Sequence, residues 1–282
     1  MGYQELWHRL AKVYDKGEAK AVARMVYEVR YGLTLPDLLV GRDSEVPQDE
    51  LEMLAARLER REPVQYVLGE AEFCGRRFGV EPGVLIPRPE TEELCRWVIG
   101  SEKRKVTSDT YSVLDIGTGS GCIAITLAAE MPEAKVTAWD VSDEALRIAS
   151  ENARRLNVPV TFEHYDILDS SLITRHSSQP YYDFIVSNPP YICEREREAM
   201  EQNVLDYEPQ TALFVPDDDP LLFYRAIARY GEGALKEDGW LYFEINPLYA
   251  DELCQLLSTM SYHDVEARED QYGKTRMIRA RR

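Results

Sequence analysis

The chain has 282 residues, enough for one large domain or two unequal ones. Its 33 lysines and arginines against 50 aspartates and glutamates give a formal net charge of -17. A negative field repels phosphate, so extended nucleic acid is a poor default partner. The N-terminus is charged throughout, unlike a signal peptide, and no uncharged apolar run approaches the roughly 18 residues of a membrane span. We therefore expect a cytoplasmic protein without a membrane segment.

The spacing of cysteine and histidine argues against disulfides and metals. The five cysteines are scattered and odd in number, and none belongs to a Cys-x-x-Cys pair. This pattern favours buried thiols in a reducing compartment. The four histidines lack the spacing of metal ligands, so we expect no metal site.

The N-terminal part of the chain predicts two small modules. Apolar residues recur at helical spacing across residues 1–68, which predicts a helical recognition or packing module. Residues 69–89 place aromatic side chains around Gly75 and end in two prolines, which predicts a hairpin linker. Residues 90–282 are left for a larger domain.

From Tyr111 onward the pattern alternates between strands and helices. Strands are expected at residues 112–116, 135–140, 160–166, 183–188, 240–245, 262–268 and 275–281. Helices are expected at residues 122–130, 143–156, 221–235 and 249–257. This alternation predicts an α/β fold with a doubly wound, mainly parallel sheet covered on both faces, closed by an antiparallel hairpin. The polar stretches 101–110 and 170–180 are expected to be surface loops.

A glycine-rich turn follows the first of these strands. It reads Asp115-Ile116-Gly117-Thr118-Gly119-Ser120-Gly121 and opens a helix, where backbone N–H groups can approach a ligand. Asp140 ends the next strand and can accept both hydroxyls of a ribose. A turn that only eases strand–helix packing is the plain structural alternative.

The main functional competitor is a dinucleotide oxidoreductase, whose fingerprint also combines glycines with a later acidic residue. Here the spacing is Gly-x-Gly-x-Gly rather than Gly-x-Gly-x-x-Gly. Asp115 also precedes the first glycine by two residues, where a carboxylate suits a cation better than a pyrophosphate. S-adenosylmethionine carries a sulfonium and an ammonium but no phosphate, so we expect this cofactor.

Two further segments are candidates for cofactor contacts. Asp166 could bond the adenine amino group while Ile167 packs on the ring, although an aspartate that merely opens a loop fits the sequence too. Glu90, Thr91 and Glu92 could approach the methionine end, although a helix start with favourable acidic charge is an equal alternative.

The candidate acceptor site is Asn188-Pro189-Pro190-Tyr191, directly after an apolar strand. The turn could be a mere strand terminator, but it falls at the carboxyl end of a strand, beside the predicted cofactor crevice. The lone pair of an amide or amine nitrogen in a planar group is delocalised, so neutral acceptors that hold its N–H bonds help more than a base. The Asn188 side-chain oxygen and the Pro189 carbonyl can supply them, and Tyr191 offers a flat apolar face.

These two motifs together resemble the class I methyltransferases that modify planar nitrogens. Alone, they leave adenine in DNA, guanine in RNA and glutamine in protein open as acceptors. The net charge disfavours a nucleic-acid amino-methyltransferase, because such an enzyme should have a basic face. An intact Asn188 argues against a non-catalytic binding protein.

Other stretches are similar to the HemK/PrmC family, which methylates the glutamine of the Gly-Gly-Gln motif in class I peptide chain release factors. They are Arg61-x-Pro63-x-x-Tyr66-x-x-Gly69, Phe73, Phe78, Leu85-Ile86-Pro87-Arg88-Pro89-Glu90-Thr91-Glu92 and Glu208-Pro209-x-x-Ala212-Leu213. The resemblance covers nearly the whole chain. It implies a helical substrate-recognition domain at 1–68, a hairpin linker at 69–89 and a catalytic domain at 90–282 with a seven-stranded, Rossmann-like sheet.

The resemblance also implies an S-adenosylmethionine-dependent glutamine N-methyltransferase that releases S-adenosylhomocysteine, with release factors as partners and no nucleic-acid substrate. It places the cofactor on Gly117–Gly121, Asp140 and Asn188, and the substrate on Asn188–Tyr191. The sequence departs from the family twice. Glu244-Ile245-Asn246-Pro247-Leu248-Tyr249 stands where Glu-x-Gly-x-x-Gln is frequent, and Asp218-Asp219-Pro220-Leu221 lacks a common glycine. We expect both departures to lie outside the chemistry and to affect local loop shape.

Overall fold

The computed structural model describes residues 1–102, 110–169 and 181–282. The rest belongs to the two polar stretches predicted as loops, so most of that prediction lies outside the described residues. The chain divides into two compact units. The smaller comprises Met1–Glu70, Val80–Pro82 and Glu201–Tyr207, and the larger comprises Ala71–Gly79, Gly83–Met200 and Glu208–Arg282.

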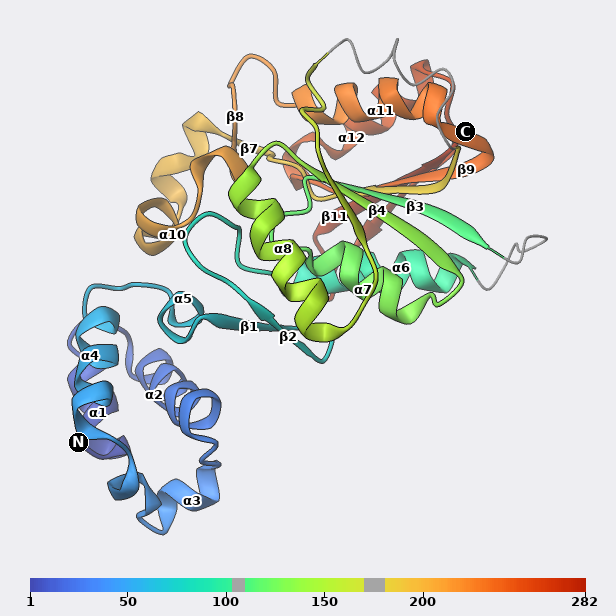
Figure 1. Cartoon of the computed structure of the whole chain (residues 1–282). Helices are drawn as coiled ribbons and strands as arrows, with labels where there is room; N and C mark the ends of the chain where they lie inside the picture. The colour runs from blue at the N-terminus through green and yellow to red at the C-terminus, as the bar shows by residue number, and fades with distance from the viewer. Residues whose placement is uncertain (103–109, 170–180) are drawn as a thin grey trace. The chain divides into compact units, whose positions relative to one another are not determined.

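The smaller unit consists of short helices around a core of its own (Figure 1). Their bounds are α1 Tyr3–Leu10, α2 Lys16–Met25, α3 Leu35–Leu39, α4 Gln48–Leu58, α5 Val64–Leu68 and α10 Gln202–Tyr207, with a π-helical turn at Val26–Arg30. The Asp15 side chain caps α2 by accepting from the backbone N–H groups of Gly17 and Glu18. Leu6 and Leu51 are fully buried, as their helical spacing predicts.

A seven-stranded sheet forms the centre of the larger unit. Its strands are β3 Tyr111–Ile116, β4 Ala134–Asp140, β5 Thr161–His164, β6 Tyr182–Ser187, β9 Leu235–Glu244, β10 His263–Glu269 and β11 Thr275–Arg281. Their spatial order is β10-β11-β9-β6-β3-β4-β5. Neighbouring strands are parallel, apart from β11, which runs antiparallel to β9 and β10. The strand order reverses between β3 and β6, which is where open α/β sheets bind ligands.

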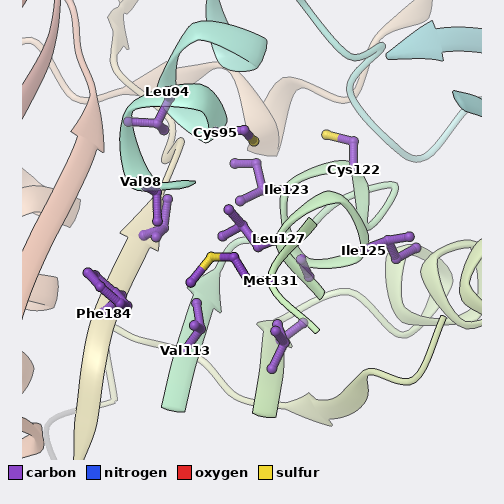
Figure 2. Close-up of a cluster of buried hydrophobic side chains, with 14 of the residues drawn as sticks. Leu94, Cys95, Val98, Val113, Cys122, Ile123, Ile125, Leu127, Met131 and Phe184 are labelled. Carbon is purple, nitrogen blue, oxygen red and sulfur yellow. The ribbon is translucent and has the colours of Figure 1, made fainter. Parts of the chain in front are cut away.

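Helices cover both faces of this sheet (Figure 1). One face carries α6 Pro89–Glu102, α7 Cys122–Glu130 and α8 Asp143–Leu156, and the other carries α11 Leu222–Ala234 and α12 Ala250–Thr259. Successive strand residues alternate between two cores, so Val113 belongs to the first and Leu114 to the second. In Figure 2, Leu127 and Met131 lie close to Val113 in the first core.

The predicted seven-stranded, mainly parallel α/β fold with an N-terminal helical region and a hairpin is confirmed. The hairpin consists of β1 Glu70–Phe73 and β2 Arg76–Gly79. The sequence did not predict a parallel pair of two-residue strands, β7 Ile192–Cys193 and β8 Phe214–Val215, because two residues carry no periodicity. Within the described residues, no helix is long and apolar enough to cross a membrane.

Candidate active site

A cleft opens in the larger unit at the carboxyl ends of β3, β4 and β6. Counted to its open mouth, its empty volume is about 1090 Å3. The cleft therefore stands where the reversal in strand order predicts it.

Most of the residues predicted for the cofactor and acceptor sites line this cleft. They are Gly117, Thr118, Gly119, Ser120, Asp140, Asp166, Ile167, Asn188, Pro189 and Pro190. Three predicted residues are not among the lining residues: Asp115, Gly121 and Tyr191. Asp115 contacts Thr118 of the lining, Gly121 lies where two helices pack, and Tyr191 bonds to Glu244, which in turn bonds to Thr91 of the lining.

Gly117 and Gly119 give the loop after β3 its shape. Their φ angles are 75° and 54°, in the left-handed region that favours glycine. A Cβ atom at either position would meet no described atom within 4 Å, so the space in front of the loop is open. Behind it, the N–H groups of Gly117 and Thr118 donate to the Trp139 carbonyl on β4, at 2.9 and 3.0 Å. The loop is thus fixed from behind and open toward the cleft.

Gly121 has a different role from the other two glycines. A Cβ atom there would lie 2.9 Å from Cδ1 of Ile125 and 3.1 Å from Cβ of Ala149 on α8. Its φ is 81°. For this third glycine the structural alternative, a turn residue that only eases packing, holds. The missing side chain lets α7 approach α8 closely.

Asp115 lies behind the glycine loop and is fully buried. Its Oδ2 atom accepts from the Thr118 hydroxyl at 2.6 Å and from the Ala124 N–H at 3.2 Å. Burial raises the pKa of this carboxyl to about 7. Its Oδ1 atom has no hydrogen-bond partner in the described parts of the chain. Asp115 is still within β3, so its side chain joins the loop to α7 rather than lining the cleft.

Asp140 ends β4 with both carboxylate oxygens held by backbone. Oδ2 accepts from the N–H of Gly119, and Oδ1 accepts from the N–H of Ser142, both at 2.9 Å. Burial raises the pKa of Asp140, against these two hydrogen bonds. Each oxygen keeps a further lone pair, so the fixed carboxylate can accept ribose hydroxyls.

Asp166 and Ile167 lie on the wall beyond β5. Asp166 is exposed, and its Oδ1 accepts from the Leu168 N–H at 2.9 Å, as in an aspartate that opens a loop. This contact leaves Oδ2 for a ligand, so the adenine contact stays a prediction. Ile167 is partly buried and packs against the second core.

Asn188 is connected to α6 through one hydrogen bond. Its Nδ2 donates to the hydroxyl oxygen of Thr91 at 3.2 Å, and Thr91 is buried and also lines the cleft. Of the three neighbouring candidates, Thr91 is the one that reaches this site. Glu90 and Glu92 do not line the cleft, and Glu92 accepts from the Cys74 N–H at the hairpin.

Glu244 lies beneath this pair at the end of β9. Its Oε2 accepts from the Thr91 hydroxyl at 2.6 Å, and its Oε1 accepts from the Tyr191 hydroxyl at 3.1 Å. Glu244 is 2% exposed, and burial raises its pKa. The Tyr191 hydroxyl therefore points away from the cleft, and contact between its ring and a planar substrate stays a prediction.

The segment from Glu244 to Tyr249 contacts the acceptor motif in the fold. We expected it to lie outside the chemistry, which stays a prediction, but Glu244 bonds to the Tyr191 hydroxyl and Asn246 bonds to the Tyr191 carbonyl. The Asn246 Nδ2 donates to the Tyr191 carbonyl at 3.1 Å and to Glu196 Oε2 at 3.0 Å. Sequence periodicity could not show this, because strand β9 meets β6 only in the folded sheet.

Two other residues near the cleft had no predicted role. Asn152 on α8 is buried, and its Nδ2 donates to the carbonyls of Ser120 and Gly79, which joins the glycine loop to the hairpin. Glu208 is buried too, and it accepts from the Ile86 N–H and from the Arg88 guanidinium. The Glu208-Pro209 and Ile86-Pro87-Arg88 stretches, which are far apart in sequence, therefore bond to each other in the fold.

The residues of the cleft fit S-adenosylmethionine. Asp140 offers a fixed carboxylate for the ribose, and Ile167 offers an apolar surface for adenine. The buried carboxyl groups of Asp115 and Glu244 do not line the cleft themselves. They accept hydrogen bonds from the hydroxyl groups of Thr118 and Thr91, which do line it. The Asp140 carboxylate in the lining favours a cationic ligand and opposes a pyrophosphate. In the part of the chain that the structure covers, no three His, Cys, Asp or Glu side chains gather as a metal site would require.

Comparison with known proteins shows the family of the chain. A family model of the PrmC N-terminal domain matches residues 3–69, and a model of the methyltransferase small domain matches residues 103–208. A protein of Bacteroides thetaiotaomicron is 47% identical over 276 residues, covering 97% of this chain and 96% of the relative. The chain belongs to the release factor glutamine methyltransferase family.

A second relative, from Flavobacterium psychrophilum, is 41% identical over 274 residues, covering 96% of this chain and 94% of its own. Both relatives are named release factor glutamine methyltransferase. The predicted HemK/PrmC family is thereby confirmed, as is an S-adenosylmethionine-dependent methyltransferase. A solved methyltransferase from Pyrococcus furiosus has a TM-score of 0.50 at 16% identity, over 80% of this chain and 96% of that one, and it shows the fold alone.

Proposed function

We propose that this protein methylates the side-chain amide nitrogen of the glutamine in the Gly-Gly-Gln motif of class I release factors, in the cytoplasm. Two near-full-length relatives of that name support the substrate. The observation that carries the proposal is the orientation of Asn188, whose amide nitrogen is bonded to Thr91 at 3.2 Å. Its side-chain oxygen is therefore left to accept an N–H group in the cleft.

When bound, S-adenosylmethionine would supply a methyl group on a cationic sulfur, and transfer of this methyl group to the amide nitrogen would release S-adenosylhomocysteine. The protein's task is to hold that nitrogen. Asn188 Oδ1 and the Pro189 carbonyl accept its two N–H bonds, so that its lone pair is aimed at the methyl group. Both acceptors bind more strongly as the nitrogen becomes positive, which stabilises the transition state. One of the two protons then leaves to water.

The proposed substrate also suits the approach to the site. Two glycines before the glutamine let the substrate backbone enter where a side chain would clash. Residues 1–68 are proposed to dock a distant surface of the release factor and to orient its loop. On this proposal, a free Gly-Gly-Gln peptide reacts poorly, and nucleic acid is not a substrate.

Mass spectrometry of a purified release factor after incubation with S-adenosylmethionine tests the proposal. The expected result is one added methyl group on the glutamine of the Gly-Gly-Gln motif. A release factor with glutamate at that place serves as the matched control, because a carboxylate has no N–H to donate. Methylation of adenine in added DNA, with none on the release factor, would reject the substrate and leave the cofactor site standing.

A further inference from the structure

Four polar side chains from three separate segments, the Asn188–Tyr191 turn, α6 and β9, form one connected chain of hydrogen bonds. Asn188 donates to Thr91 at 3.2 Å, Thr91 donates to Glu244 at 2.6 Å, and Tyr191 donates to the other oxygen of Glu244 at 3.1 Å. Thr91 and Glu244 are each 2% exposed, so water does not compete freely for these groups. We refer to Asn188, Thr91, Glu244 and Tyr191 as the relay.

The relay has a direction, which follows from counting protons. An ionised Glu244 can only accept, so the hydroxyl groups of Thr91 and Tyr191 must each donate their single proton to it. The Thr91 oxygen then has only lone pairs left, and it must accept from Asn188. The nitrogen of the Asn188 amide is thereby assigned to Thr91, and its oxygen is turned to the cleft.

We infer that Glu244 is a positioning residue that fixes the Asn188 side-chain oxygen toward the acceptor, so that the site selects a group presenting N–H. The inference rests on the proposed function in one respect, because glutamine is taken as the group presented. Glu244 does not line the cleft, so it acts through Thr91 and Asn188.

The inference includes a dependence on pH. A protonated Glu244 could donate to Thr91, whose own proton would then turn to Asn188 and favour the reversed amide. Burial raises the pKa of Glu244, Glu90 on α6 raises it further, and the hydroxyls of Thr91 and Tyr191 lower it. Arg276 on β11 also lowers the pKa, while Tyr224 on α11 donates to the Glu244 backbone carbonyl and Cys122 on α7 lies within its electrostatic reach. Turnover should therefore fall as acid protonates Glu244.

Substitutions along the relay test the inference with the full-length protein and a release factor as substrate. Glu244→Gln replaces one of the two acceptor oxygens with an NH2 donor, so that residue 244 can no longer accept from both Thr91 and Tyr191. Thr91→Val removes the connecting hydroxyl at nearly constant volume. Each should lower kcat by roughly 10–100-fold, because a misoriented Asn188 oxygen no longer aligns the substrate nitrogen with the methyl group. Thr91→Ser keeps the hydroxyl and should restore most of the activity. Thr126→Val is the matched control, since the buried Thr126 hydroxyl has no partner among the described residues.

The pH profile separates positioning from general damage to the fold. In the wild type, kcat should fall on the acid side as Glu244 takes up a proton, whereas Thr91→Val should lose that acid limb along with its activity. If Glu244→Gln fails to fold, the Thr91→Val and Thr91→Ser pair still decides the matter. Thr91→Val with the activity and pH profile of Thr126→Val would overturn the inference. A wild-type protein that leaves the release factor unmethylated would instead overturn the proposed function.

Discussion

The two ends of the cleft are held in different ways. The glycine loop is fixed mainly by backbone groups within one β–α–β segment, where Gly117 and Thr118 bond to β4 and Asp140 bonds back to Gly119. The acceptor end is fixed by side chains that come from distant parts of the chain, with Thr91 and Glu244 separated by 153 residues. A local motif can therefore describe most of the first end, with Asn152 as the exception, whereas it describes only one member of the second.

The largest expected effect lies at the acceptor end. Asn188→Ala removes the oriented acceptor and should lower turnover by roughly 100–1000-fold, as for loss of one preorganised polar group. Single-turnover kinetics at saturating cofactor measure the effect, and calorimetry reports any separate loss of cofactor affinity. Near-normal turnover in a folded variant would show that Asn188 does not contribute to methyl transfer. The proposed role of the acceptor end would then be rejected.

At the cofactor end, Asp140→Ala should weaken S-adenosylmethionine binding by about 1–3 kcal/mol, because the ribose hydroxyls lose a fixed, charged acceptor. Calorimetry gives the affinity directly. Asp143→Ala is the control, since the Asp143 side chain is 88% exposed and does not line the cleft. Equal affinities for the two variants would refute the role of Asp140.

The third glycine of the loop should affect stability more than binding. Gly121→Ala places a Cβ atom 2.9 Å from Ile125 at a φ of 81°, so it should reduce the free energy of unfolding by about 1–3 kcal/mol. Chemical denaturation measures this. Gly233→Ala in α11 meets nothing within 4 Å and should leave stability equal or slightly higher. If the two variants proved equally stable, close packing of α7 on α8 would not explain Gly121.

The smallest effect is expected for Tyr191→Phe, which keeps the ring and removes one donor to Glu244. The loss of a single hydrogen bond corresponds to about 0.5–1.5 kcal/mol in turnover. That bond lowers the pKa of Glu244, so its removal should raise the pKa. The acid limb of the kcat profile should then move to higher pH, and a shift to lower pH would contradict the assigned direction of the relay.

The contrast between the two ends also explains what the sequence could predict. Strand and helix periodicity identified the sheet, and the Gly117–Gly121 spacing with Asp140 identified one wall of the cleft, because each pattern is contained in a short window. Glu244 was visible only as the start of a departure from the family pattern, since nothing in its neighbourhood shows that β9 brings it under Thr91. Asn152 was likewise missed because its partners, Gly79 and Ser120, are far away in sequence.

The wide separation of Thr91 and Glu244 has a consequence for biosynthesis. A ribosome adding roughly 5–20 residues per second completes Glu244 about 8–30 s after Thr91, given the 153 residues between them. During that interval β3, α7 and β4 are synthesised, with the glycine loop and Asp140, while Thr91 still has no Glu244 carboxylate to bond. On the proposed role of Glu244, the nascent protein is expected to orient Asn188 toward a substrate only after β9 has been made.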